Sequence, residues 1–263
     1  MTAAVAIRLG RIGYVNMAPV FFRLHAEVEE VVGVPTALNR QLVAGELDIA
    51  PISSIAYARH AEQLRLLPRL CVSSEGAVES IQLVSKTPLQ RIRTVAVTPE
   101  SATSVVLTKV LLPEAEQVPL DAESEREVEA KLLIGDAALR SAFEDPTPHH
   151  DLGRLWLERT GLPMVFAVWA APEPTHPELP ELEDALVESV RAARAEPELL
   201  AHESSQRYGY PPGFLARYFE KLRYRFGPRE RAGLYTFLEL AQDVGELDAV
   251  PELRFVTAAR AGV

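Results

Sequence analysis

The chain has 263 residues, of which 48% are hydrophobic and 24% charged, and its formal net charge is -10 at pH 7. A chain of this length buries a large core and has the size at which one core tends to divide into two, so we expect two lobes. The negative charge disfavours nucleic acid and anionic membranes as partners, because both attract basic patches and the sequence has no long basic run. The charge of an anionic ligand would have to be stabilised by groups within its own binding site.

The sequence also argues against export, membrane insertion and metal binding. The N-terminal segment lacks a basic region followed by a long apolar core, which disfavours a secretory signal and predicts a cytoplasmic protein. No stretch approaches the roughly 18 consecutive apolar residues that a spanning helix needs. The single cysteine, Cys71, excludes an intramolecular disulfide and a multi-cysteine metal site, and we interpret it as a buried structural thiol.

The first part of the chain alternates short β-like runs with helical segments. Strands are predicted at residues 5–9, 28–34, 47–52 and 66–72. Helices are predicted after Pro19, from Thr36 and after the third strand, which indicates βαβ units and a mainly parallel sheet. Thr36 is expected to cap its helix, and Gly45 is expected to end that helix.

A second α/β set follows a half-buried strand at residues 80–85. Its predicted elements are, in order, a strand at 94–98, a helix at 101–112, an acidic helix at 122–131, a strand at 132–134, a short helix after Asp136, a helix at 151–160 and a buried strand at 164–171. A proline-rich linker follows, and the remainder is predicted to be helical. We expect a first lobe of residues 1–85 and 172–263 and a second of residues 86–171. Two crossing strands would join these lobes around a central cleft, a preferred place for ligands.

Polar residues stand where the predicted strands run into helices. Asn16 follows the first strand, where its amide can hydrogen-bond a ligand or simply cap the next helix. Hydroxyl residues occupy two further helix starts, as Ser53 and Ser54 and as Ser101, Thr103 and Ser104. Helix N-termini carry unsatisfied N–H groups and a partial positive charge, so they can bind carboxylates without a lysine. Each of these serines can equally be an ordinary cap.

Three more candidates lie at the ends of predicted strands. Ser80 begins the first crossing strand, and Gly135 ends a later strand where a missing side chain lets a ligand approach the backbone. Asp136 comes next and can also cap the following helix. His149 and His150 have no third ligand at metal spacing, so we predict no metal site. The sequence has no glycine-rich phosphate loop, nucleophile elbow or HExxH motif.

In this order the segments resemble the chorismate dehydratase family of the futalosine route to menaquinone, over nearly all of the first 171 residues. The matching stretches are GYVNMAP at 13–19, GELDIAPISSIAYA at 45–58, GAVESI at 76–81, SATS at 101–104, IGDAAL at 134–139 and the segment from Trp156 to GLPMVFA at 161–167. The resemblance implies the periplasmic-binding-protein type II fold and conversion of chorismate to 3-[(1-carboxyvinyl)oxy]benzoate with loss of water. It nominates Asn16 and Ser80 as the leading active-site positions.

The implied chemistry suits these residues without a cofactor. Removing the ring proton beside the enol ether gives an anion conjugated with the ring carboxylate, and expelling the neighbouring hydroxyl yields an aromatic ring. Groups around Ser80, Thr103 and Ser104 are expected to stabilise that charge. Asn16 is expected to orient the leaving hydroxyl, and Ser80 to bind a substrate carboxylate. No side chain is an obvious base, so the substrate's own enolpyruvyl carboxylate is the candidate proton acceptor.

Three other functions stay open. The related dihydroxynaphthoate synthase carries a histidine base where this chain has Gly135, which favours the dehydratase. A receptor for small carboxylates would share the fold but would need an export signal. An effector domain of a transcription regulator would need a helix-turn-helix segment, whereas the predicted elements begin with a strand.

Overall fold

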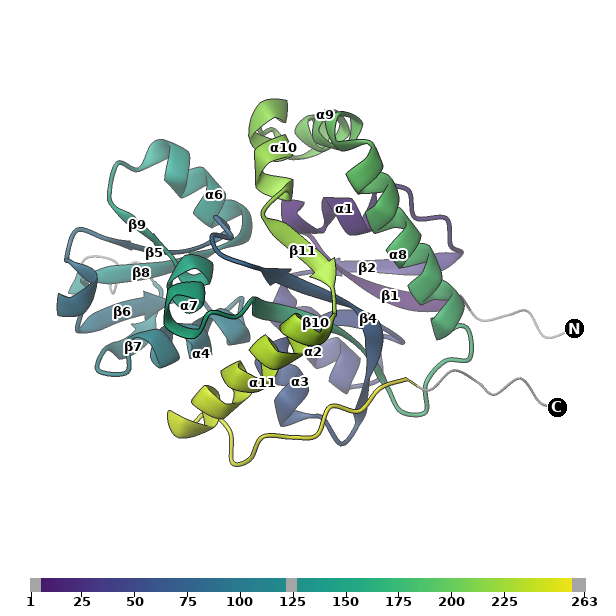
Figure 1. Ribbon diagram of the computed structural model, residues 1–263, viewed down its shortest axis with the longest axis horizontal. Helices are drawn as coiled ribbons and strands as arrows, with labels where there is room; N and C mark the ends of the chain where they lie inside the picture. Colours follow the sequence, from purple (N-terminus) through teal and green to yellow (C-terminus); the bar gives the residue numbers. More distant parts are fainter. Residues whose placement is uncertain (1–5, 122–126, 257–263) are drawn as a thin grey trace, which may run out of the picture.

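The computed structural model describes residues 6–121 and 127–256, which form two α/β lobes (Figure 1). Their strands are ordered β1-β2, β11-β4-β10-β3 and β7-β6-β8-β5-β9. In Figure 1 the third sheet lies on the left and the strands of the other two lie on the right. This arrangement confirms the expected α/β class with two lobes.

The first lobe contains the two smaller sheets. Its strands are β1 (Ile7–Ile12), β2 (Val28–Gly33), β3 (Ala50–Ser53), β4 (Leu64–Ser74), β10 (Met164–Pro172) and β11 (Leu222–Arg225). β1 and β2 pair in parallel, whereas β10 runs antiparallel to β3 and β4. The Gly10 amide donates a 2.8 Å hydrogen bond to the Ile49 carbonyl and so joins β1 to the segment before β3. A Cβ at Gly10 would lie 2.6 Å from that of Ala50, so this close approach requires glycine.

The second lobe is built on one mixed sheet. Its strands are β5 (Ile81–Ser85), β6 (Thr94–Val97), β7 (Glu116–Pro119), β8 (Ala130–Ile134) and β9 (His149–Asp151). β6 is parallel to β7 and β8, and β5 is antiparallel to β8 and β9. Every residue of β5 is buried, although the sequence predicted a half-buried strand, because two helices of this lobe pack on β5.

Helices cover both lobes. Those of the first lobe are α1 (Ala18–Phe21), α2 (Pro35–Val43), α3 (Ser54–Arg59), α8 (Leu179–Ala195), α9 (Pro197–Tyr208), α10 (Pro212–Phe219) and α11 (Pro228–Asp243). Those of the second are α4 (Ala102–Leu111), α6 (Gly135–Glu144) and α7 (Leu152–Thr160), and 3-10 turns occur at Val15–Met17 and Leu89–Arg91. α8 packs on β4 and α1, and α11 packs on β10 and also contacts α4 of the second lobe.

The sheet pairing shifts two strands relative to the expected lobe boundaries. β5 was expected in the first lobe, but it pairs with β8 and β9 of the second. β10 was expected in the second lobe, but it pairs with β3 and β4 of the first. The crossings are therefore the short segments 75–80 and 161–163, which precede these two strands.

Several local predictions need correction. Thr36 does not cap α2, because Pro35 already occupies the first turn and Val34 is the cap residue. Gly45 does follow the end of α2, with a φ of 73°. Of the acidic helix predicted at 122–131, residues 122–126 lie outside the described chain, and its last residues begin β8. β7, β9 and β11 were not predicted.

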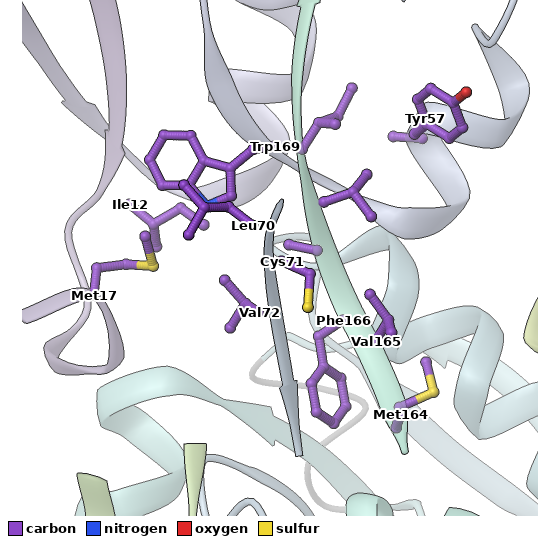
Figure 2. Close-up of a cluster of buried hydrophobic side chains, with 14 of the residues drawn as sticks. Ile12, Met17, Tyr57, Leu70, Cys71, Val72, Met164, Val165, Phe166 and Trp169 are labelled. Carbon is purple, nitrogen blue, oxygen red and sulfur yellow. The ribbon is translucent and has the colours of Figure 1, made fainter. Parts of the chain in front are cut away.

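The core of the first lobe surrounds β4 and β10. Figure 2 shows Trp169 of β10 beside Leu70, with Phe166 and Cys71 further along the same two strands. Trp156 of the second lobe and Trp169 are both fully buried. Cys71 is a buried free thiol, as expected, and burial raises its pKa strongly.

Within residues 6–121 and 127–256, no helix combines the length and apolar character needed to cross a bilayer. Nor do these residues contain a group of three side chains arranged to hold a metal ion.

Candidate active site between the lobes

A narrow cavity of about 60 Å³ lies between residues of the two lobes. It collects six of the nine candidate residues from the sequence: Asn16, Ser53, Ser80, Ser101, Ser104 and Gly135. Its walls are otherwise mainly apolar or aromatic, with Tyr14, Val72 and Phe166 among them. Among the described residues, no arginine, lysine or histidine lines it, so hydroxyls, amides and backbone N–H groups must bind an anionic ligand.

Asn16 lies in the 3-10 turn that follows β1. Its backbone carbonyl accepts a hydrogen bond from the Tyr224 hydroxyl of β11. The Asn16 Oδ1 atom is buried and has no hydrogen-bond partner among the described residues. The alternative that Asn16 caps a helix is wrong, since Met17 is the cap residue of α1 and no side chain caps that helix. An unpaired buried acceptor on a cavity wall is the arrangement expected of a ligand-binding amide.

Ser80 ends the first crossing segment and is almost completely buried. Its hydroxyl donates only a long 3.4 Å hydrogen bond, to the Val78 carbonyl. Its own carbonyl accepts from the Gly135 amide at 2.7 Å, which ties the crossing to the start of α6. Glu79 adopts a φ of 59°, a left-handed conformation that is rare outside glycine.

The Asp151 carboxylate holds this strained crossing in place. It accepts hydrogen bonds from the amides of Val78 and Glu79 and from the Gln82 side chain at 2.6 to 3.1 Å. The same carboxylate caps α7 through the Arg154 amide at 3.0 Å. Charged acceptors form the stronger class of hydrogen bonds, so Asp151 fixes the backbone on which Ser80 stands.

Ser53 and Ser54 differ in role although they are neighbours. The Asn39 side chain donates to the Ser53 hydroxyl at 3.0 Å and accepts from the Ser53 amide at 3.1 Å. The Ser53 hydroxyl hydrogen therefore stays available on the cavity wall. Ser54 does not line the cavity; it donates a 2.7 Å hydrogen bond to the Val165 carbonyl and joins α3 to β10.

The start of α4 supplies two further hydroxyls. Ser101 caps α4 by accepting from the Ser104 amide at 3.2 Å, and the two hydroxyls lie 2.9 Å apart. Both line the cavity. Thr103 does not, because its hydroxyl accepts a 3.3 Å hydrogen bond from the Ile55 amide of the opposite lobe. Ser101 is thus a cap, as its alternative interpretation held, and a wall residue as well.

Gly135 lines the cavity, and Asp136 lies behind it. The φ of Gly135 is 54°, and a Cβ there would lie 2.7 Å from the Tyr14 ring. Asp136 is in the first turn of α6 rather than at its cap, and its Oδ1 accepts from the Val15 amide at 3.1 Å. Burial raises the pKa of Asp136. This aspartate joins the lobes and does not face the cavity.

Tyr14 is a site residue that sequence reasoning missed. Its ring covers Gly135, and its hydroxyl donates a 2.7 Å hydrogen bond to the Glu100 carboxylate of the second lobe. Burial is the main reason that the pKa of Tyr14 is strongly raised. The only signal was its place two residues before Asn16, in the same strand-end motif.

His149 and His150 line a separate pocket of about 420 Å³ beside β9. The Nδ1 atom of His149 lies 2.6 Å from the Thr147 carbonyl and its Nε2 atom 3.0 Å from the Ser141 hydroxyl. Both ring nitrogens thus have protein partners, so this histidine is a structural group.

The sequence signature described as "Menaquinone biosynthesis" matches residues 7–243. The chain belongs to this menaquinone biosynthesis family. A Thermus thermophilus protein named chorismate dehydratase is 37% identical over 258 residues, which cover 88% of this chain and 93% of that protein. A Campylobacter jejuni protein of the same name is 35% identical over 60% of this chain and 64% of its own length. The resemblance inferred from the strand-end motifs is confirmed.

Solved structures show the same fold at lower identity. An Archaeoglobus fulgidus protein matches 92% of this chain and 98% of its own with a TM-score of 0.77 at 21% identity. The periplasmic aliphatic sulphonate binding protein of Escherichia coli matches 99% of this chain and 96% of its own with a TM-score of 0.67 at 13% identity. The expected periplasmic-binding-protein-like fold is therefore confirmed.

Proposed function

We propose that this chain is a chorismate dehydratase, a lyase that converts chorismate to 3-[(1-carboxyvinyl)oxy]benzoate and water in menaquinone biosynthesis. The observation that carries the proposal is the Thermus thermophilus relative, which matches this chain along nearly its whole length and is named for this activity. Membership in the menaquinone biosynthesis family supports the same assignment.

The groups that line the cavity suit a substrate with two negative charges, bound without a positively charged side chain. The first turn of α4 offers backbone N–H groups and a partial positive charge next to the hydroxyls of Ser101 and Ser104. The hydroxyl of Ser80 has one long hydrogen bond, which must break before the hydroxyl can bind a ligand. In this proposal Ser80 binds a substrate carboxylate, and the α4 turn stabilises the charge that develops on the ring.

The two halves of the elimination can be assigned without a basic side chain on the cavity wall. The enolpyruvyl carboxylate takes the ring proton beside the enol ether, and the electron pair of that C–H bond delocalises toward the ring carboxylate. The C–O bond to the hydroxyl on the adjacent ring carbon then breaks, and the ring becomes aromatic. The abstracted proton and the expelled hydroxide together make up the released water. Asn16 orients the leaving hydroxyl through its unpaired Oδ1.

The packing of Gly135 argues against the dihydroxynaphthoate synthase as an alternative. That activity is expected to need a histidine at this position. A side chain there would begin 2.7 Å from the Tyr14 ring, and the φ of 54° disfavours any residue with a Cβ. With Tyr14 in place, the wall of this cavity accepts only glycine.

The proposal is tested by incubating the purified protein with chorismate in chelator-treated buffer and analysing the product by mass and ultraviolet spectroscopy. A product lighter by one water with an aromatic spectrum is expected. If the folded protein leaves chorismate unchanged yet chorismate raises its melting temperature, the chain is a binding protein and the proposal fails. Unchanged chorismate without any thermal shift would contradict both functions.

A further inference from the structure

Three tyrosines of the C-terminal segment reach three of the chain segments that line the cavity. The Tyr210 hydroxyl donates to the Asp136 carbonyl at 3.0 Å, and the Tyr224 hydroxyl donates to the Asn16 carbonyl. Tyr218 lies between them in sequence, on α10, and its hydroxyl interacts with that of Ser80. Figure 1 shows α10 and β11 beside the junction of the two lobes.

Neighbouring aromatic rings hold the phenol ring of Tyr218, but its hydroxyl has no hydrogen-bond partner among the described residues. The side chain is fully buried, and its ring stacks on Phe214 with centroids 6.1 Å apart and packs on Phe219 at 5.7 Å. The buried hydroxyl completes no hydrogen bond with any described residue. Leaving such a group unpaired is costly, which is why unpaired buried hydroxyls call for a functional explanation.

The hydrogen-bonding capacity of the Ser80 hydroxyl is also poorly satisfied. Its hydroxyl donates to the Val78 carbonyl at 3.4 Å, too long for a strong hydrogen bond, and no described residue donates a hydrogen bond to its oxygen. Burial raises the pKa of Tyr218 strongly, and the neighbouring Ser80 hydroxyl is the largest opposing influence. The phenol therefore stays protonated, and its O–H is available to donate to Ser80.

We propose that Tyr218 is a positioning residue, whose phenol O–H donates to the Ser80 oxygen when the Ser80 hydroxyl turns from Val78 to the substrate. This inference rests on the proposed dehydratase function. Tyr218 is absent from the cavity wall, so it acts through Ser80 and does not touch the substrate. A donor behind Ser80 polarises its O–H bond and strengthens the hydrogen bond that Ser80 gives to a carboxylate.

The chain provides a matched control in Tyr208. Its hydroxyl is also buried and unpaired among the described residues, but it lies on α9 and does not line the cavity. Tyr208→Phe and Tyr218→Phe each remove one buried hydroxyl that has no hydrogen-bond partner among the described residues. If both hydroxyls were only unpaired buried groups, both variants would keep full activity and would melt at or above the wild-type temperature.

The test measures kcat/KM for chorismate and the melting temperature of wild type, Y208F, Y218F, S80A and the Y218F/S80A double variant. We expect Y218F to lose about tenfold in kcat/KM without a lower melting temperature, while Y208F stays within twofold of wild type. In the S80A background the Y218F change should cost nothing further, because the group that Tyr218 positions is gone.

Equal activity of Y218F and wild type would overturn the positioning role and leave the dehydratase assignment intact. A loss of the same size in the S80A background would also overturn it, since Tyr218 would then act independently of Ser80. Wild-type protein that does not convert chorismate would remove the proposed function, and this inference with it.

Discussion

Asn16 combines a buried, unpaired side-chain oxygen with a backbone carbonyl held by Tyr224. The backbone contact fixes the residue, so its side-chain amide is held in position to bind a ligand and is not needed for the fold. We expect Asn16→Ala to lower kcat on chorismate by about 100-fold or more, as for loss of one preorganised polar group. The melting temperature should not fall, because no protein hydrogen bond is lost. Normal turnover by the folded variant would show that Asn16 has no role in the reaction.

Gly135 and Gly161 share a left-handed backbone but differ in their surroundings. Their φ values are 54° and 70°, yet a Cβ would meet the Tyr14 ring at 2.7 Å only at position 135 and nothing within 4 Å at position 161. Gly161→Ala should therefore cost only backbone strain, roughly 1 kcal/mol. Gly135→Ala adds overpacking and should cost about 2–4 kcal/mol, with loss of activity. Urea denaturation measures both, and equal destabilisation would mean that Tyr14 moves aside freely.

Asp136 gives the fold a predictable pH dependence. Because burial raises its pKa above the value in the unfolded chain, the native state holds this proton more tightly. Its favourable contribution is therefore complete at acid pH and is lost as pH rises through the raised pKa. Asp136→Asn keeps an oxygen for the Val15 amide but removes the titration. Melting temperatures at pH 4 and pH 7.5 should show D136N gaining relative to wild type at the higher pH, whereas a constant difference would contradict this account.

At the scale of elements, the crossing before β5 is a strained segment that one carboxylate supports. Asp151→Asn leaves one side-chain oxygen for four hydrogen-bond donors. The NH₂ group of the new asparagine cannot accept a hydrogen bond from any of them. We expect a loss of about 2–3 kcal/mol in the free energy of unfolding, together with lower kcat/KM as Ser80 is released.

Asp184→Asn is the control for Asp151, since that exposed carboxylate only pairs with Arg69 and should contribute less than about 1 kcal/mol. Both are measured by urea denaturation. Equal effects of the two substitutions would mean that the crossing does not depend on Asp151.

The element pattern was predictable where hydrophobic runs are long and not where strands are short. β4 and β10 were found from their apolar runs, but β9 spans three polar residues, His149–Asp151, and is a strand only because it pairs with β5. β11, with the alternating sequence LRYR, lies between helices and pairs with β4. Tertiary pairing, which no local pattern encodes, defines both.

The candidate site was predictable to the level of strand ends and no further. Asn16, Ser53 and Ser80 could be named because chain segments leaving a sheet meet at its edge. Which neighbour faces the cavity depends on side-chain direction, so Ser54 and Asp136 were grouped with them although both turn elsewhere. Tyr218 could not be found from the sequence, because nothing local links α10 to Ser80.

At the scale of the whole molecule, hydrogen bonds across the junction hold the lobes around a small cavity. Tyr14 to Glu100, Val15 to Asp136 and Ile55 to Thr103 all connect one lobe to the other. A volume of about 60 Å³ is far below the roughly 300–1,000 Å³ of ligand pockets, so a substituted ring with two carboxylates needs the lobes to separate before it binds. Hinge opening of this kind is the motion by which two-lobed folds admit a ligand.

A crystal structure of the protein with 3-[(1-carboxyvinyl)oxy]benzoate would show directly whether this cavity is the active site. We expect the product between the lobes, in an enlarged form of the same cavity. A carboxylate should lie within hydrogen-bonding distance of the Ser80 hydroxyl, and the ring position that lost its hydroxyl should face Asn16. Product bound elsewhere, or between the lobes without contact to either residue, would show that this cavity does not carry out the dehydration.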